Sequence, residues 1–172
     1  MLYYTYGIYR KMKVVILLFN LTCFFIGHRN TPETLFPLLL QSIERHIANY
    51  GTINFVVGNH GNFDVMAAKA VIKIKQSQPN IKLALLLPYK QDRQSTLPPG
   101  FDNAVYPKGI EKTPQKQAID WANHYMIDNS DFLIAYACHS GNAARLYQYA
   151  YEREKQGLII MENLAQEKGN SI

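Results

Sequence analysis

The sequence predicts an α/β fold, with one domain built on a mostly parallel sheet that carries helices on both faces. Short apolar segments typical of strands alternate at least four times with longer segments whose apolar residues recur at helical spacing. Residues 81–87 are apolar almost throughout, as in a strand that is covered on both faces. A chain of 172 residues that is 48% hydrophobic and 18% charged can bury one full core.

The strands and helices are expected in alternating order along most of the chain. Strands are predicted at residues 22–26, 53–57, 81–87, 103–106, 132–137 and 158–161. Helices are predicted from Thr31 to Gly51, from Phe63 to Pro79, from Thr113 to Asn129 and from Ala143 to Gly157. Thr31 and Thr113 each precede a proline, which is typical of a capping hydroxyl followed by a first-turn proline. Residues 90–112 form a long polar loop that acts as a lid or a spacer.

Residues 1–21 are expected to be an N-terminal extension or lead strand outside the domain at 22–165. Basic residues precede the apolar run at 14–19, as in a secretion signal, but no small-residue cleavage site follows. That run is also shorter than the roughly 20 residues that span a bilayer. We therefore expect a lead strand or a surplus extension rather than a membrane signal, and no membrane partner. The tail at 166–172 is expected to be frayed.

Three turns at the ends of predicted strands carry glycine and polar side chains: Gly27-His28-Arg29, Gly58 to Asp64, and Ser140-Gly141-Asn142. Parallel strands end at the same edge of a sheet, and ligands bind there. A strand that turns through glycine into a helix leaves backbone N–H groups free at the positive end of the helix dipole. Both features favour an anion such as a phosphate. The turns therefore predict a pocket for a nucleotide-type ligand.

Charge and cysteine content add weaker expectations. The net charge of +5 permits contact with nucleic acid, but the basic residues are scattered and form no tract. The expected partner is therefore a nucleotide-type small molecule rather than nucleic acid, and a homo-oligomer stays open. Cys23 and Cys138 lie in or after apolar runs, so we expect buried thiols in a cytoplasmic protein. The five histidines lack metal-ligand spacing, and no metal or cofactor is expected.

Five stretches, in consistent order and spacing, carry a family resemblance: Phe24 to Arg29, Phe55 to Asp64 followed by Ala67-Ala68, Leu85 to Tyr89, Asn123 to Met126, and Ser130 to Tyr136. They resemble the SLOG superfamily, a Rossmann-like group that includes the LOG cytokinin-activating enzymes and the DprA DNA-processing proteins. The likeness is greater to its YpsA-like bacterial branch. The resemblance covers about residues 22–165 and implies a pocket for a nucleotide or nucleotide-derived ligand.

The chain departs from that branch at two positions. Ala122 stands where relatives commonly have arginine, so one bidentate phosphate contact is missing. The last turn reads Ser140-Gly141-Asn142-Ala143 where relatives have a Gly-Gly-Ala element. Both departures bear on the identity of the ligand.

The candidate ligand-binding residues are Gly27, His28, Arg29, Gly58, Asn59, His60, Gly61, Asp64, Pro88, Tyr89, Ser140, Gly141 and Asn142. Arg29 is a candidate phosphate clamp, and His28 a partner for a ribose or a base. Tyr89 is a candidate stacking residue, and Ser140 is expected to cap the helix that follows it. Asp64 either receives a ribose hydroxyl or serves as a first-turn acid that the helix dipole favours.

Three functions remain open from the residues and the resemblance. The first is a domain that binds or senses a nucleotide-type ligand. The second is a nucleoside-monophosphate N-glycosidase like the LOG enzymes, for which Asp64 is the well-placed carboxylate because the 140–151 segment has no acid. The third is DNA handling like DprA, for which the chain lacks a basic stripe.

Overall fold

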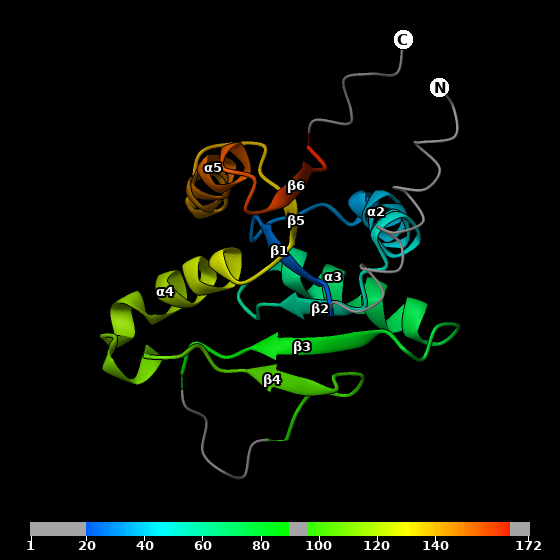
Figure 1. Ribbon diagram of the computed structural model, residues 1–172, viewed down its shortest axis with the longest axis horizontal. Coiled ribbons are helices and arrows are strands. Elements are labelled where there is room, and N and C mark those ends of the chain that lie inside the picture. The colour runs from blue at the N-terminus through cyan, green and yellow to red at the C-terminus, as the bar shows by residue number, and fades with distance from the viewer. Residues whose placement is uncertain (1–19, 90–95, 166–172) are drawn as a thin grey trace, which may run out of the picture.

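In the part of the chain that the structure describes, six parallel strands form a single sheet in the order β4-β3-β2-β1-β5-β6 (Figure 1). This computed structural model describes residues 20–89 and 96–165. The strands are β1 (Thr22–Gly27), β2 (Asn54–Val57), β3 (Lys82–Leu86), β4 (Asn103–Val105), β5 (Phe132–Tyr136) and β6 (Ile160–Asn163). Every pair of neighbouring strands among them is parallel. The predicted fold class is confirmed, including the short strand expected near residue 103.

Helices cover both faces of the sheet. They are α2 (Phe36–Tyr50), α3 (Asn62–Lys75), α4 (Gln115–Asp128) and α5 (Asn142–Lys155), with short 3-10 helices η1 (Glu33–Leu35) and η2 (Ile110–Lys112). The first two helices pack on one face, and the last two pack on the other (Figure 1). The chain adds strands outward from β1 to β4 and then returns to place β5 on the other side of β1. Right-handed connections require the helices to change face at that return.

The central strand shows why its sequence is apolar throughout. Cys23 and Phe25 point into the core under α2 and α3, whereas Phe24 and Ile26 point into the core under α4 and α5. Successive side chains of a strand face opposite sides, so a strand that is covered on both sides has no solvent face. All four residues are at most 4% exposed, which makes β1 the centre of both cores.

The sheet changes direction between β1 and β5. These strands pair from Cys23 opposite Phe132 to Gly27 opposite Tyr136, so they end side by side. The chain leaves β1 toward α2 on one face and leaves β5 toward α5 on the other. The two connections therefore diverge and leave room at the carboxyl ends of the strands, which is where open α/β sheets bind ligands.

Two predicted helix caps are wrong. Thr31 does not cap a helix, because its hydroxyl donates to the His28 carbonyl oxygen at 2.7 Å and Pro32 precedes η1. The Thr113 hydroxyl contacts the Gly109 carbonyl oxygen at 3.5 Å, and Pro114 holds the N-cap position of α4. In both places the threonine closes the preceding turn, and the proline starts the helix.

Several sequence expectations fall outside the described residues. The N-terminal extension lies there up to residue 19, as do the frayed tail and residues 90–95 of the long loop. The division of the chain into extension, domain and tail therefore stays a prediction. Among the residues that the structure describes, no helix has both the length and the apolar character needed to cross a bilayer.

Candidate functional site

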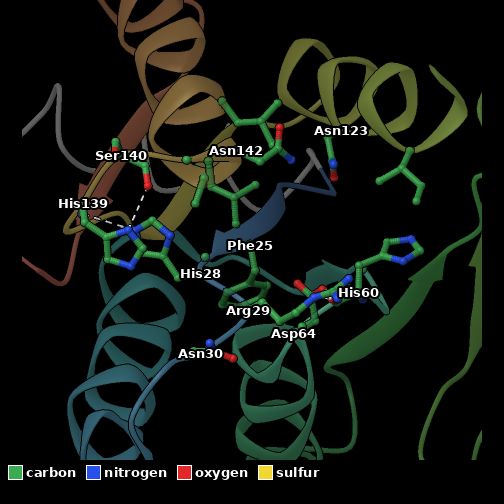
Figure 2. Close-up of a pocket in the computed structure, with 18 residues that line it drawn as sticks. Phe25, His28, Arg29, Asn30, His60, Asp64, Asn123, His139, Ser140 and Asn142 are labelled. Carbon is green, nitrogen blue, oxygen red and sulfur yellow. Dashed lines mark hydrogen bonds between the residues drawn. The ribbon is translucent and has the colours of Figure 1, made fainter. Parts of the chain in front are cut away.

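A cavity of about 400 Å³ lies at the carboxyl ends of β1 and β5 (Figure 2). Its volume is within the range of about 300–1,000 Å³ that is typical of small-molecule sites. The turns after β1, β2 and β5 all contribute to it, as the sequence predicted. The candidate residues that line the cavity are Gly27, His28, Arg29, Gly58, His60, Gly61, Asp64, Ser140, Gly141 and Asn142.

Three candidate residues do not line this cavity. Asn59 is exposed to solvent and is not among the residues that line the cavity. Pro88 and Tyr89 follow β3, and β2 lies between β3 and β1. Their turn is therefore one strand farther from the cavity than the turn after β2. The Tyr89 hydroxyl instead donates to the Gln115 carbonyl oxygen at 3.4 Å. Stacking of a ligand in this cavity on Tyr89 is therefore not supported by its position.

The sequence prediction missed one wall of the cavity. Ile119 and Asn123 of α4, with Ala143 and Leu146 of α5, line this wall. The two α4 residues are four positions apart and so share one side of the helix. The Asn123 carboxamide is half-buried and makes no hydrogen bond with any residue that the structure describes. The helical spacing of α4 was readable in the sequence, but its position over the cavity depends on the strand order.

His28 joins the turns after β1 and β5. Its side chain is buried, and its Nε2 accepts hydrogen bonds from the backbone N–H groups of Cys138 at 3.1 Å and His139 at 3.4 Å. Its ring also stacks on that of His139, with ring centroids 3.6 Å apart. Burial lowers the pKa of His28, and the neighbouring His139 lowers it further. The imidazole is therefore a neutral acceptor that holds the two turns together.

The turn after β2 is closed by its own carboxylate. Asp64 Oδ2 accepts a hydrogen bond from the backbone N–H of His60 at 2.9 Å. Burial raises the pKa of Asp64, while hydrogen bonds from the N–H groups of His60 and Gly61 oppose that rise. A carboxylate at this helix start takes N–H groups that an anionic ligand would otherwise use. This turn is therefore a less suitable anion site than its glycines suggest.

Arg29 lies directly beside that turn. Its Nε donates to the His60 carbonyl oxygen at 3.1 Å, and its carbonyl oxygen accepts from the Asn62 N–H at 2.9 Å. A Cβ at Gly61 would lie 2.9 Å from the Arg29 Cα, so the close approach of the two backbones requires glycine. The terminal guanidinium nitrogens make no hydrogen bond within the described part of the chain and remain available to a ligand.

The N-terminus of α5 is open to the cavity. Gly141 holds the N-cap position with a φ of 142°, and no side chain of the described residues caps the helix. The predicted cap by Ser140 is therefore wrong; its carbonyl oxygen instead lies 2.8 Å from His139 Nδ1. Within residues 20–89 and 96–165, no acceptor is found for the N–H groups of Asn142, Ala143 and Ala144. Free N–H groups at a helix start form an anion-binding site.

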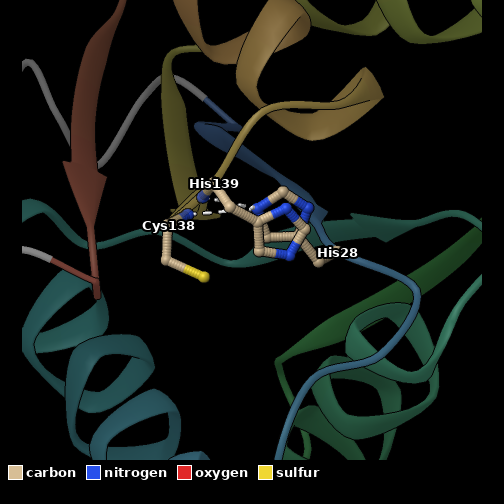
Figure 3. Close-up of side chains that lie close together, drawn as sticks. All are labelled: His28, Cys138 and His139. Atoms are coloured by element: carbon tan, nitrogen blue, oxygen red, sulfur yellow. Dashed lines mark hydrogen bonds between the residues drawn. The ribbon is translucent and has the colours of Figure 1, made fainter.

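A cluster at the edge of the cavity departs from two sequence expectations (Figure 3). Cys138 was expected to be buried but is exposed, because it follows the last buried residues of β5 and lies on the turn. His28 and His139 were not expected to share a site. Folding nevertheless brings ligand atoms of His28, Cys138 and His139 within 4.8 Å of one another. Their separation in the sequence concealed this arrangement.

Comparison with known proteins supports the fold. No family model matches the chain, and no curated protein sequence matches it. A solved structure of DNA processing protein A from Helicobacter pylori, described for its single-stranded DNA binding mode, is similar to it. The TM-score is 0.51, the sequence identity is 18%, and the match covers 87% of this chain and 79% of that chain. DNA processing protein A belongs to the superfamily that the sequence resembles, and at this identity the likeness concerns the fold.

This comparison contradicts the expected partner. We expected a nucleotide-type small molecule and gave nucleic acid little weight, because the basic residues form no stripe. The similar protein binds single-stranded DNA. The expectation failed because scattered charge was taken as a sign against nucleic acid, although one arginine and one helix N-terminus can face the same cavity without forming a sequence tract.

Proposed function

We propose that the cavity between β1 and β5 binds single-stranded DNA, with one backbone phosphate at the N-terminus of α5. The observation that supports this most strongly is the pairing of two unused positive groups around one cavity. These are the free N–H groups of Asn142 to Ala144 and the terminal guanidinium of Arg29. Backbone N–H groups at a helix start and arginine are both common phosphate ligands.

The positions of these groups favour a strand over a free mononucleotide. Arg29 and Asn142 lie on opposite sides of the cavity in Figure 2. A mononucleotide has its phosphate at one end only, so it can satisfy one of the two groups. A strand has a phosphate on each side of every nucleoside, so two successive phosphates can contact both groups. The similar protein from Helicobacter pylori, which binds single-stranded DNA, supports the same choice.

The wall between the two groups suits a nucleoside. Ile119 and Leu146 offer apolar contacts to a sugar or to the face of a base, and such contacts tolerate any base. The half-buried Asn123 carboxamide, which has no partner among the described residues, is available to hydrogen-bond a base edge. We expect modest sequence preference, because one carboxamide is a small part of the contact surface.

One of the earlier possible functions ranks lower after this argument. The N-glycosidase alternative receives less support, because the Asp64 carboxylate is engaged by the His60 N–H in its own turn. Assignment to the YpsA-like branch of the SLOG superfamily remains a proposal that rests on the sequence stretches quoted above.

Binding of a fluorescent single-stranded oligothymidylate, followed by anisotropy, tests the proposal. We expect Arg29→Ala to weaken binding about 10-fold or more, because a charge-assisted phosphate contact is worth roughly 1.5–3 kcal/mol. Lys82→Ala is the matched control. It removes the same charge from the first residue of β3, at the opposite edge of the sheet, where the side chain is 54% exposed. This variant should bind like the wild type.

The salt dependence and the competitor identify the ligand class. Each phosphate contact with a single strand contributes about −0.7 to the slope of the logarithm of the association constant against the logarithm of the salt concentration. Two contacts therefore predict a slope of about −1.4. Thymidine monophosphate should compete weakly. Equal losses in the Arg29 and Lys82 variants, or tight binding of the mononucleotide without binding of the strand, would overturn the proposal.

A further inference from the structure

We propose that His28, Cys138 and His139 form a binding site for a divalent transition metal of the zinc class at the edge of the cavity. Two imidazoles and one thiolate are a donor set that Zn²⁺ and Co²⁺ commonly use. The ligand atoms come from two turns, after β1 and after β5, and lie within 4.8 Å of one another (Figure 3). Three protein ligands would leave one coordination position open.

The hydrogen bonds of the two histidines place a lone pair on Nε2 of each ring. His139 Nδ1 lies 2.8 Å from the Ser140 carbonyl oxygen, which can only accept, so Nδ1 carries the proton and Nε2 has a lone pair. A histidine that donates its other N–H to a backbone carbonyl is the usual arrangement at metal sites. His28 Nε2 likewise has a lone pair, because it accepts from the N–H groups of Cys138 and His139.

The lone pair of His28 is directed at the turn that carries the other two ligands. A bound cation would replace the two backbone N–H groups as the partner of Nε2. One of these hydrogen bonds is long, at 3.4 Å, and both N–H groups lie on a turn whose side chains are exposed. Metal binding therefore exchanges these two part-buried hydrogen bonds for a bond from Nε2 to the ion.

Metal binding requires the His139 ring to leave its stack on His28, because two nearly parallel rings 3.6 Å apart cannot direct their in-plane lone pairs at one ion. With Zn–N distances of about 2.0–2.1 Å and a Zn–S distance of about 2.3 Å, tetrahedral ligand atoms lie roughly 3.3–3.6 Å apart. The ligand atoms, which lie within 4.8 Å of one another, must therefore approach by up to roughly 1.2–1.5 Å. His28 is fixed by burial, whereas His139 and Cys138 are exposed and can turn toward it.

Titration of the full-length, chelator-stripped protein with Co²⁺ tests this site by absorption spectroscopy. We expect a thiolate-to-cobalt charge-transfer band that saturates at about one ion per chain and disappears when Zn²⁺ is added, because Zn²⁺ binds such donor sets more tightly than Co²⁺ does. Cys138→Ser should abolish the band. His139→Ala should weaken Co²⁺ binding at least 10-fold. Both substituted side chains are exposed, so their variants should retain the wild-type unfolding transition.

Two control variants make the result specific. Cys23→Ala removes the other cysteine, which is 0% exposed in the core, and His60→Ala removes a histidine that lines the cavity outside the cluster. Both should retain the band. Absence of the band in the wild type, its survival in Cys138→Ser, or an equal loss in His60→Ala would overturn the proposal. The measurement contains no DNA, so its outcome is separate from that of the proposed function.

Discussion

At the scale of single residues, the cavity is formed by side chains and glycines that serve the turns themselves. His28 holds two turns together through Nε2, and Asp64 closes a third through the His60 N–H. The sequence indicated that these polar residues lie at strand ends. It could not show which of them were already engaged by backbone groups, because those partners depend on the turn geometry.

Asp64 gives a prediction about pH. Burial raises its pKa above the usual 3.8, so the folded state keeps the proton at a pH where the unfolded state has lost it. The protonated Asp64 side chain therefore adds to the free energy of unfolding at low pH. This contribution is lost as the pH rises from about 3.8 through the folded-state pKa. Asp64→Asn cannot lose a proton, and its Oδ1 can still accept from the His60 N–H. We expect its stability relative to the wild type to rise over that window.

Urea unfolding at several pH values checks this sign, and Asp102 supplies the comparison. Burial alone would raise the pKa of Asp102, but hydrogen bonds from Lys75 and the Leu83 N–H lower it on balance. Asp102→Asn should therefore lose stability relative to the wild type as the pH rises. If both variants changed in the same direction, the assigned environment of Asp64 would be wrong.

Gly61 gives a prediction about close packing. Its φ of −162° is extended and open to any residue, so a substitution causes no backbone strain by itself. A Cβ would nevertheless lie 2.9 Å from the Arg29 Cα, a backbone atom that cannot move without shifting the turn. We expect Gly61→Ala to lower the free energy of unfolding by about 1–3 kcal/mol.

The exposed neighbour Asn59 provides the control for Gly61. Asn59→Ala should change the urea midpoint by an amount equivalent to less than about 0.5 kcal/mol, because the residue is exposed to solvent. A Gly61→Ala variant with wild-type stability would show that the two turns are not in contact as described.

At the scale of elements, the sequence predicted the strands and helices well and their caps poorly. The spacing of apolar residues shows which side of each helix or strand must be buried in the core. The predicted elements therefore agree with the observed ones. Caps depend on one or two local hydrogen bonds. Three residues have side chains suited to capping: Thr31, Thr113 and Ser140. In each case the next residue holds the N-cap position instead, and these residues are Pro32, Pro114 and Gly141.

Glu162 links two elements that are distant in the sequence. From β6 it accepts a hydrogen bond from the Ser42 hydroxyl of α2 at 2.8 Å and forms an ion pair with Arg45. Ser42 is 0% exposed, so its hydroxyl has little access to water once this acceptor is removed. We expect Glu162→Ala to destabilise the protein by about 1–3 kcal/mol in urea unfolding.

An exposed ion pair serves as the control for Glu162. Glu152 and Lys155 are paired on the surface of α5, with side chains 52% and 51% exposed. Glu152→Ala should cost less than about 0.5 kcal/mol, because surface pairs contribute little. Equal losses in the two variants would contradict the role given to the link between α2 and β6.

At the scale of the whole molecule, the strand order decides which turns meet. Parallel strands and Gly-containing turns predicted that polar residues would gather at one edge. They did not reveal that β2 separates β3 from β1, which removes Pro88 and Tyr89 from the cavity, or that α4 would supply Ile119 and Asn123. The same topology brings Cys138 and His139 to His28. Such long-range contacts leave no local pattern in the sequence.

The most direct measurement of the central claim is a titration of the ¹⁵N-labelled protein with single-stranded oligothymidylate, followed by amide chemical shifts. If a phosphate binds at the start of α5, the amide signals of Asn142, Ala143 and Ala144 should shift and saturate together with the side-chain Nε–H of Arg29. Shifts confined to residues outside the cavity, with these four signals unchanged, would contradict the account.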